Sequence, residues 1–262
     1  MLCNVIPGRD PRSYADLAHK VVNDNPDVIV TVAPLIPAFR AATQSLPIAG
    51  FIGDPISLGF AASLARPGGN ITGVSIDAGV EVYGKQLQIL KEVVPSAGKV
   101  GYLATERVWR TPIAQAARDA SRQLGISLIG MVLPEVTVAE LTRVFHDAEA
   151  TSIDAIAVSP SGELIGSIES IVKLVAARQL PAIYAYREYP EAGGLMAYAP
   201  ELDQPARHLA RQVHEILNGT KPGELPIFQA TKFDLVLNQQ AARALGINFP
   251  QALLARADEV IE

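Results

Sequence analysis

Charged and hydroxyl side chains stand directly after three apolar runs of this sequence, at Asp54, at Ser159 with Ser161, and at Arg187. Each run is typical of a buried strand in a parallel sheet, and ligands of open α/β sheets bind where such strands end. A carboxylate such as Asp54 accepts hydrogen bonds from an ammonium group, while an arginine holds a carboxylate through two parallel bonds. The two serines precede a helix, whose free N–H groups attract anions. All four residues are therefore candidates for binding a small charged solute.

Each of these residues also has a structural interpretation. Asp54 suits the position before a helix whose first turn Pro55 fixes, where its side chain would cap the helix. The two serines suit helix capping as well. Arg187 has Glu188 and Glu191 within reach as ion-pair partners. The sequence leaves these alternatives open, and capping by Asp54 is compatible with ligand binding.

Aromatic side chains add flat apolar faces beside these groups. Trp109, the only tryptophan, lies in the loop TERVWRT between a predicted strand and a helix that opens near Pro112. Tyr186 directly precedes Arg187. Rings at such positions stack on ligands or shield a cleft, but burial between loops explains Trp109 equally well.

Signatures of catalysis are missing. The sequence has no G-x-S-x-G elbow, no G-x-x-x-x-G-K-[ST] loop and no G-x-G-x-x-G. None of the four histidines, His19, His146, His208 and His214, has a second histidine or a cysteine three or four positions away. No candidate loop pairs a nucleophile with a base. We therefore expect a binding protein and not an enzyme, with no cofactor and no metal site.

Short apolar runs alternate with amphipathic helices along the chain. In the helices, apolar residues recur with a period near 3.6, as in the stripe of Leu141, Val144 and Phe145 that Thr137 and Glu140 cap. Strand–helix–strand units of this spacing predict right-handed crossovers and an α/β fold of parallel sheets with helices on both faces. The strands are predicted at Asp27–Ala33, Pro47–Ile52, Ile71–Ser75, Lys99–Ala104, Ser127–Leu133, Asp154–Ser159, Ala182–Ala185 and Gly194–Tyr198.

Three composition breaks interrupt this alternation, at Asp77–Gly84, Ala199–Gln204 and Asn218–Glu224. Three breaks are consistent with two α/β lobes if the chain passes from one lobe to the other three times. We expect the links near Ser75–Gly79, Ala199–Asp203 and Ile227–Thr231.

Composition excludes other functions. With 262 residues the chain can bury a large core in one domain or two lobes. A net charge of −5 without clustered Lys and Arg argues against nucleic acid as a partner. No apolar run approaches the ~20 residues that span a bilayer, and no signal peptide is visible. Cys3, the only cysteine, excludes an internal disulfide and is interpreted as an incidental apolar residue.

Four motifs together resemble those of a known family: GDPISLGFAASLARPGGNITGVS, YGKQLQILKEVVPSAGKVGYL, YREYPEAGGLMAYAPEL and LPIFQATKFDLVLNQQAARALGINFPQALLARADEVIE. From Asp27 to Glu262 the chain is similar to substrate-binding proteins of ABC importers, in the group that includes tryptophan- and tyrosine-binding proteins. The resemblance implies the type I periplasmic-binding-protein fold, in which two Rossmann-like lobes close on a ligand. It implies that residues 1–75 with 202–221 form one lobe, and 76–201 with 222–262 the other.

The resemblance also implies a role. The protein would capture a small solute in the cleft between the lobes, an amino acid with an apolar or aromatic side chain. It would deliver this solute to an ABC permease, in the periplasm or outside the cell. Because no signal peptide is visible, a cytoplasmic ligand-sensing or regulatory domain of the same fold is the alternative. The expected ligand-binding residues are Ala33, Pro34, Leu35, Gly53, Asp54, Pro55, Trp109, Ser159, Ser161, Tyr186 and Arg187.

Two departures from the family pattern add expectations. Ala33 to Pro37 contains two prolines and two bulky aliphatic residues where members carry small residues with free N–H groups, so the ligand differs from the family's amino acids or binds weakly. The family's first strand and helix have no counterpart before the match. We therefore expect an exposed strand edge and a homodimer, unless Met1–Ile6 or another chain fills the gap.

Overall fold

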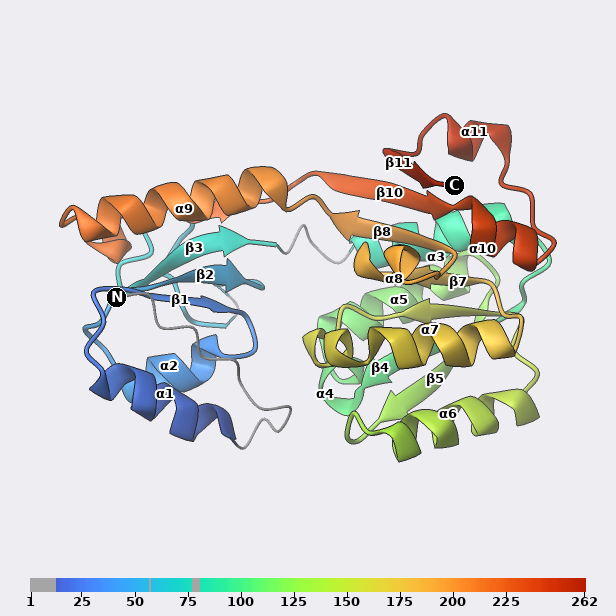
Figure 1. The fold of residues 1–262 in the computed structure, drawn as a ribbon, viewed down its shortest axis with the longest axis horizontal. Coiled ribbons are helices and arrows are strands. Elements are labelled where there is room, and N and C mark those ends of the chain that lie inside the picture. Colours follow the sequence, from blue (N-terminus) through green and yellow to red (C-terminus); the bar gives the residue numbers. More distant parts are fainter. Residues whose placement is uncertain (1–12, 57, 77–80) are drawn as a thin grey trace. The chain divides into compact units, whose positions relative to one another are not determined.

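The protein forms two compact α/β units in the computed structural model, which describes residues 13–56, 58–76 and 81–262 (Figure 1). The first unit comprises Met1–Ala78 and Glu201–Thr231, and the second comprises Gly79–Pro200 and Lys232–Glu262. The chain therefore passes between the units three times. The expectations for Cys3 and for Met1–Ile6 fall outside the described residues.

In its described part, the first unit holds four parallel strands in the order β1-β2-β3-β9. Helices α1 and α2 cover one face of this sheet and α9 covers the other (Figure 1). The elements are α1 (Ser13–Asn23), β1 (Ile29–Val32), α2 (Ile36–Ala42), β2 (Ile48–Ile52), β3 (Ile71–Ser75), α9 (Asp203–Leu217), the 3₁₀ turn η2 (Pro222–Glu224) and β9 (Phe228–Gln229).

Two glycines let β2 and β3 approach each other closely. Gly50 and Gly73 are register partners, and a Cβ atom on Gly73 would lie 2.0 Å from the carbonyl oxygen of Gly50. Gly73 also has φ +144°, a value that glycine adopts far more readily than other residues. Gln212 of α9 donates to the carbonyl oxygens of Gly73 at 3.2 Å and Pro226 at 2.7 Å. The close approach of the strands and the attachment of α9 thus meet at one residue.

The segment 222–231 belongs to the first unit, whereas we expected it in the second lobe. Strand β9 extends the first sheet by pairing with β3. The hydroxyl of Thr72 donates to the carbonyl oxygen of Leu225 at 2.9 Å, and the N–H of Ile227 donates to that of Leu64 at 2.7 Å. These two bonds and the pairing of β9 with β3 hold the segment in the first unit, which explains why the chain returns to the second unit only after residue 231.

Among the described strands, β1 lies at the edge of the first sheet and pairs with β2 alone. Val30 and Val32 on this strand are about half exposed. An edge strand with exposed apolar side chains invites pairing with another chain. The homodimer expected from such an edge stays a prediction.

The second unit holds seven described strands in the order β11-β10-β8-β7-β6-β4-β5. Strand β10 runs antiparallel to β8, an exception to the parallel pattern that we expected. The cause is connectivity: the chain leaves the unit at the end of β8 and returns directly into β10 beside it. The elements are α3 (Glu81–Val93), β4 (Lys99–Thr105), α4 (Glu106–Trp109), α5 (Pro112–Gln123), β5 (Ser127–Leu133), α6 (Val138–Ala150), β6 (Ala155–Val158), η1 (Gly162–Ser167), α7 (Ile168–Ala177), β7 (Ala182–Tyr184), α8 (Glu188–Glu191), β8 (Met196–Pro200), β10 (Phe233–Asn238), α10 (Gln239–Ala244), α11 (Gln251–Leu254) and β11 (Glu259–Ile261).

Helices bury both faces of this second sheet (Figure 1). On one face α3 and α5 pack against inward residues such as Tyr102 of β4. On the other face α6 and α7 pack against the alternate residues, such as Leu103. The predicted cap of α6 is confirmed, since the hydroxyl of Thr137 accepts the N–H of Glu140 at 3.2 Å. Burial on both faces explains why these strands are continuous apolar runs. No helix in the described part of the chain is long and apolar enough to cross a membrane.

Asp154 holds the amino ends of β4 and β6 together. Its Oδ2 atom accepts the N–H groups of Lys99 at 2.8 Å and Gly98 at 2.7 Å. These bonds keep the pKa of the Asp154 carboxyl below its ordinary value, because they favour the charged form. The side chain thus helps to fix the register in which these two neighbouring strands begin.

We expect Asp154→Ala to lower the free energy of unfolding by about 1 kcal/mol at neutral pH. This is less than buried hydrogen bonds to a charged acceptor contribute, because Asp154 is exposed and water screens its charge. The folded-state pKa is depressed, so this stabilisation exists above the unfolded-state pKa and is lost as the pH falls through the folded value. Urea denaturation of the second unit, followed by hydrogen exchange, should show wild type and variant converging as the pH falls below the folded-state pKa of Asp154. Asp147→Ala, on exposed α6, is the control. An equal difference at neutral and acidic pH would contradict this role.

Candidate functional site

The carboxyl ends of β4 and β6 form the topological switch point of the second sheet. From β4 the chain moves outward to β5 and then returns to the other side of β4 as β6. The helices that follow, α5 after β4 and α7 after β6, pack on opposite faces of the sheet. Open α/β sheets bind ligands at such a point, in the crevice outside the carboxyl ends of the strands.

Three buried hydroxyl groups connect the loop that follows β4 with the loop that follows β6. The Oγ atoms of Ser159 and Ser161 lie 2.8 Å apart, and that of Ser161 lies 3.3 Å from Oγ1 of Thr105. All three side chains are buried. The two serines bond to each other and to the end of β4. Ser161 precedes η1 without a side-chain capping bond, so the capping interpretation is wrong for Ser161, whereas carboxylate binding by the serines stays a prediction.

An ion pair also joins these two loops. Arg107, on α4, donates to Glu163, on η1, through Nε to Oε1 at 2.8 Å and through Nη2 to Oε2 at 3.0 Å. The Arg107 side chain is 61% exposed and that of Glu163 only 19%. Burial alone would raise the pKa of the Glu163 carboxyl, but hydrogen bonds from Arg107 and from its own backbone N–H outweigh burial and lower it. Glu163 therefore stays ionised at neutral pH.

Sequence reasoning missed both members of this pair. The signal that was available lies in their positions, because Arg107 stands in the loop that contains Trp109 and Glu163 follows Ser161 by two residues. Their partnership spans 56 positions of sequence, so the pairing itself needs the β4–β6 register.

Tyr186 lies beside this pair. Its hydroxyl donates to the carbonyl oxygen of Pro160 at 3.0 Å. Burial, followed by the charge of Glu163, raises the pKa of the Tyr186 phenol. The ring therefore packs against the loop after β6 and stays neutral. Tyr186, Ser159 and Ser161 thus gather in one cluster, as expected of residues at neighbouring strand ends.

Arg187 does not join this cluster. Its Nε atom donates to Glu191 at 3.0 Å and its Nη2 atom to Glu259 of β11 at 2.6 Å. The structural interpretation with Glu191 is therefore confirmed, and Glu259 is a further partner from a strand far along the chain. This guanidinium ties α8 to β11, which places it beyond β7 and β8 from the switch point.

Trp109 shares α4 with Arg107 but packs on the sheet. A Cβ atom on Gly130 of β5 would lie 2.8 Å from its ring, so this glycine makes room for the indole. The ring lies 6.1 Å from that of Tyr102, and the Arg118 guanidinium covers it at 4.7 Å. Burial between elements, the second interpretation of Trp109, matches this geometry.

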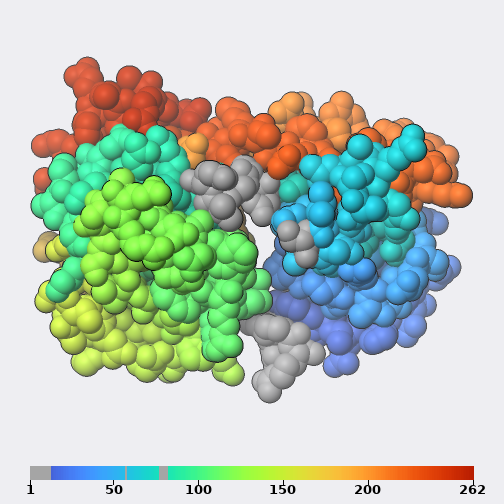
Figure 2. All heavy atoms as spheres, turned by 180° about the vertical axis from the view of Figure 1, so that it is seen from behind, coloured from blue at the N-terminus to red at the C-terminus, as the bar shows by residue number. Residues whose placement is uncertain are grey.

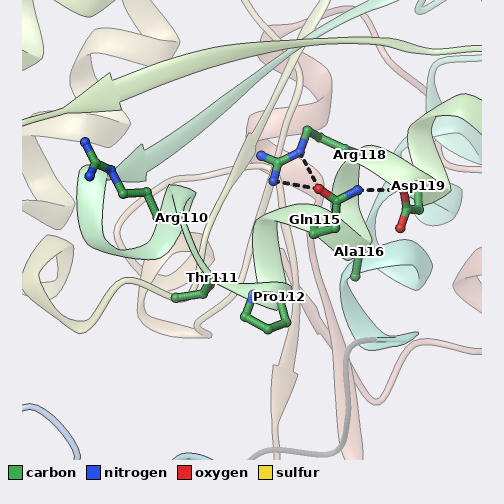
Figure 3. Close-up of a pocket in the computed structure, with 7 residues that line it drawn as sticks. All are labelled: Arg110, Thr111, Pro112, Gln115, Ala116, Arg118 and Asp119. Carbon is green, nitrogen blue, oxygen red and sulfur yellow. Dashed lines mark hydrogen bonds between the residues drawn. The ribbon is translucent and has the colours of Figure 1, made fainter.

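A shallow hollow of about 450 Å³ lies beside the start of α5 (Figure 3). Its polar side chains are engaged with one another. Gln115 accepts from Arg118 at 3.0 Å and donates to Asp119 at 2.9 Å, while Arg110 pairs with Glu106. Helix α5, in green, lies on the surface of the second unit (Figure 2). The hollow is lined by Arg110, Thr111, Pro112, Gln115, Ala116, Arg118 and Asp119.

In the first unit, the loop after β2 supplies Gly53, Asp54 and Pro55. Oδ1 of Asp54 accepts the N–H of Ile56 at 3.0 Å, so the side chain shapes a turn. The prediction of a helix that Asp54 caps is wrong, because the described residues between β2 and β3 form turns and bends. The hydroxyl of Ser75 donates to the carbonyl oxygen of Gly53 at 3.0 Å and anchors the loop to β3. Pro55 is buried. Beyond this turn, Ile56 and Leu58 are about half exposed.

The loop after β1 lies beside that turn, since β1 and β2 are neighbouring parallel strands. Ala33 and Pro34 are partly exposed there, and Leu35 is buried as the residue before α2. The N–H of Leu35 donates to the carbonyl oxygen of Val32 at 3.0 Å. This loop therefore offers apolar surface at the carboxyl end of β1, as its prolines suggested.

Two α/β units with largely parallel sheets, joined by three chain crossings, have the type I periplasmic-binding-protein fold. Residues 8–261 match the family described as ABC transporter substrate binding protein, and the chain belongs to this family. It is a family of substrate-binding proteins and not a class of enzymes.

Two of the proteins that are similar to this chain are associated with aromatic amino acids by their names. The tyrosine-binding protein of Clostridioides difficile (strain R20291) is 22% identical over 239 residues, which are 90% of this chain and 68% of that protein. A solved ABC domain from Streptococcus pneumoniae, in complex with L-Trp, is 23% identical with a TM-score of 0.85. A conserved domain protein from Vibrio cholerae is 27% identical with a TM-score of 0.85. Both structural matches cover 96% of this chain and 84% of the other.

Proposed function

We propose that this protein captures an amino acid with an aromatic or branched apolar side chain and presents it to an ABC permease for import. On this proposal it acts outside the cytoplasm and has no catalytic role. The relatives named above support the solute class, because one is a tyrosine-binding protein and one was solved with L-Trp.

The observation that carries the solute class is the exposure of large apolar side chains beside charged groups at the carboxyl ends of the strands. Ile56 and Leu58 follow Asp54 in the first unit, and Ile165 follows Glu163 in the second. Exposed apolar side chains that gather at a ligand-binding edge favour a partly apolar ligand. We propose that the apolar part of the solute packs against exposed apolar residues of this kind at the carboxyl ends of the strands.

Asp54 keeps the ligand-binding role that we expected, together with its turn. Because its carboxylate already accepts the N–H of Ile56, it is held in one position. Ala33, Pro34 and the glycine of the same turn supply apolar and backbone surface around it. In the second unit Tyr186 and the two buried serines support the loops that hold Arg107 and Glu163. We assign Trp109 and Arg187 to scaffold roles, because their partners lie within the fold.

Calorimetry with a panel of amino acids tests this proposal. We expect at least one of L-tyrosine, L-tryptophan, L-phenylalanine and L-leucine to bind with a Kd of about 1 μM, equivalent to ~8 kcal/mol. L-lysine, L-glutamate and D-ribose should bind far more weakly. Absence of binding by every amino acid at millimolar concentration would overturn the proposal.

Two matched leucine variants test the position of the apolar surface. Leu58 and Leu217 belong to the same unit and are 51% and 56% exposed. Leu58→Asn should raise the Kd roughly tenfold, since apolar contact worth ~1.4 kcal/mol is lost. Leu217→Asn should leave the Kd unchanged, because Leu217 does not lie near the carboxyl ends of the strands. It ends α9 near the 3₁₀ turn η2, and the carbonyl oxygen of Gly223 in that turn accepts the N–H of Gly68, just before β3 begins. Equal affinities of the two variants would remove Leu58 from the site.

A further inference from the structure

The ion pair between Arg107 and Glu163 differs in position from the other ion pairs of the second unit. Among the described residues, most of those pairs join neighbours on one helix, as Arg143 does with Glu140, or tie peripheral elements, as Arg256 does with Glu92. Arg107 and Glu163 instead stand on the two loops that border the switch-point crevice. The pair is therefore located where the fold binds ligands.

The charges of the pair are also complementary to those of a zwitterion. An α-amino acid carries a carboxylate, which a guanidinium fork binds with two parallel hydrogen bonds, and an ammonium, which a carboxylate accepts. Arg107 and Glu163 present one group of each kind, at present satisfied by each other through two bonds of 2.8 and 3.0 Å. A zwitterion inserted between them would replace each of these bonds with an equivalent one.

The two partners differ in freedom. Arg107 is 61% exposed on a four-residue helix, so its long side chain can turn without disturbing the core. Glu163 is 19% exposed and lies near the buried phenol of Tyr186. A partly buried carboxylate that loses its cation is strongly destabilised. If Arg107 turns away, Glu163 needs another cation, and an ammonium group supplies one.

We propose that this pair opens to bind the charged head of the amino acid, with Arg107 turning to the solute carboxylate and Glu163 accepting the solute ammonium. This inference rests on the proposed function and assigns the head-group contacts of the same site. It makes Arg107 and Glu163 the residues that distinguish an amino acid from an amine or an acid of the same side chain.

The test measures three ligands against three proteins by calorimetry. The ligands are L-tyrosine, tyramine, which lacks the carboxylate, and 3-(4-hydroxyphenyl)propionic acid, which lacks the ammonium. The matching set for a branched solute is L-leucine, 3-methylbutylamine and 4-methylpentanoic acid. The proteins are wild type, Arg107→Gln and Glu163→Gln. Arg256→Gln, which opens the distant pair with Glu92, is the matched control.

We expect Arg107→Gln to weaken binding of the amino acid about 30-fold or more. It should bind the amine at least as tightly as wild type does, because the amine has no carboxylate for Arg107 to bind and no longer has to displace Arg107 from Glu163. Glu163→Gln should weaken binding of the amino acid by a similar factor and bind the acid at least as tightly as wild type does. The control should bind all three ligands as wild type does.

A purely structural role of the pair predicts a different pattern. Each variant would then weaken amino acid, amine and acid by one common factor, and that result would overturn the inference. Unchanged affinity of both variants for an amino acid that wild type binds would overturn it as well, while leaving the proposed function intact. If wild type binds no amino acid, the proposed function itself fails.

Discussion

Gly73→Ala should lower the free energy of unfolding of the first unit by about 3–5 kcal/mol. The new Cβ atom would lie 2.0 Å from the carbonyl oxygen and 2.7 Å from the nitrogen of Gly50. Both atoms belong to the backbone of β2, so relief requires the two strands to separate. Alanine must in addition adopt φ +144°, which is strained for any residue with a Cβ.

Gly69→Ala is the matched control, because a Cβ atom on Gly69 meets nothing within 4 Å and the residue lies in the loop before β3. Hydrogen exchange in increasing urea should show early opening of peptides from β2 and β3 in the Gly73 variant alone. The second unit should keep its wild-type protection. If β2 and β3 are equally protected from hydrogen exchange in the two variants, the predicted clash between residue 73 and Gly50 does not occur.

Asn238→Ala should destabilise the second unit by about 2–4 kcal/mol. The side chain is buried at the end of β10 and makes two bonds. Oδ1 accepts the N–H of Ala241 at 2.9 Å and caps α10, while Nδ2 donates to the carbonyl oxygen of Pro190 in α8 at 2.9 Å. Alanine removes both bonds, so the N–H of Ala241 loses its acceptor and the carbonyl oxygen of Pro190 loses one donor, while it keeps the N–H of Gly193 at 3.0 Å.

A second substitution separates the two contributions. Asn238→Ser retains a capping oxygen but is too short to reach Pro190, so it should recover about 1 kcal/mol of the loss. Urea denaturation followed through peptides of β10 and α10 measures both variants. If serine and alanine are equally destabilising, the cap contributes little and the bond to Pro190 accounts for the effect.

The strands of this fold were predictable because the signal is local. Helices cover both faces of the second sheet, so β4 and β6 have inward residues at every position and form continuous apolar runs. All eight predicted runs overlap β1 to β8. The short β9, of two residues, and the partly buried β11 carry no such pattern, and β10 was not predicted either. Their places depend on the return of the chain from one unit to the other.

Candidate site residues were predictable only where their partners are near in sequence. The turn of Asp54 closes on Ile56, two residues away, and Arg187 reaches Glu191 within one helical turn. The partners of Ser161 and of Arg107 lie 56 residues away. Those pairings arise from the register of β4 against β6, which no spacing in the sequence reveals. Tertiary pairing therefore joined the two serines to each other and to Thr105, and it produced an ion pair that the sequence did not predict.

The three crossings of the chain bear on how the protein is made. The ribosome synthesises β3 long before β9, although the two strands are neighbours in the first sheet, where Val74 pairs with Phe228. At ~5–20 residues per second, the roughly 150 residues between them take about 8–30 s to translate. During this interval the nascent chain carries an open strand edge and a sheet face that α9 has yet to cover. The second unit is likewise incomplete until β10 has followed β9. Both units therefore finish folding at nearly the same moment, after synthesis of the last segment, and not one after the other.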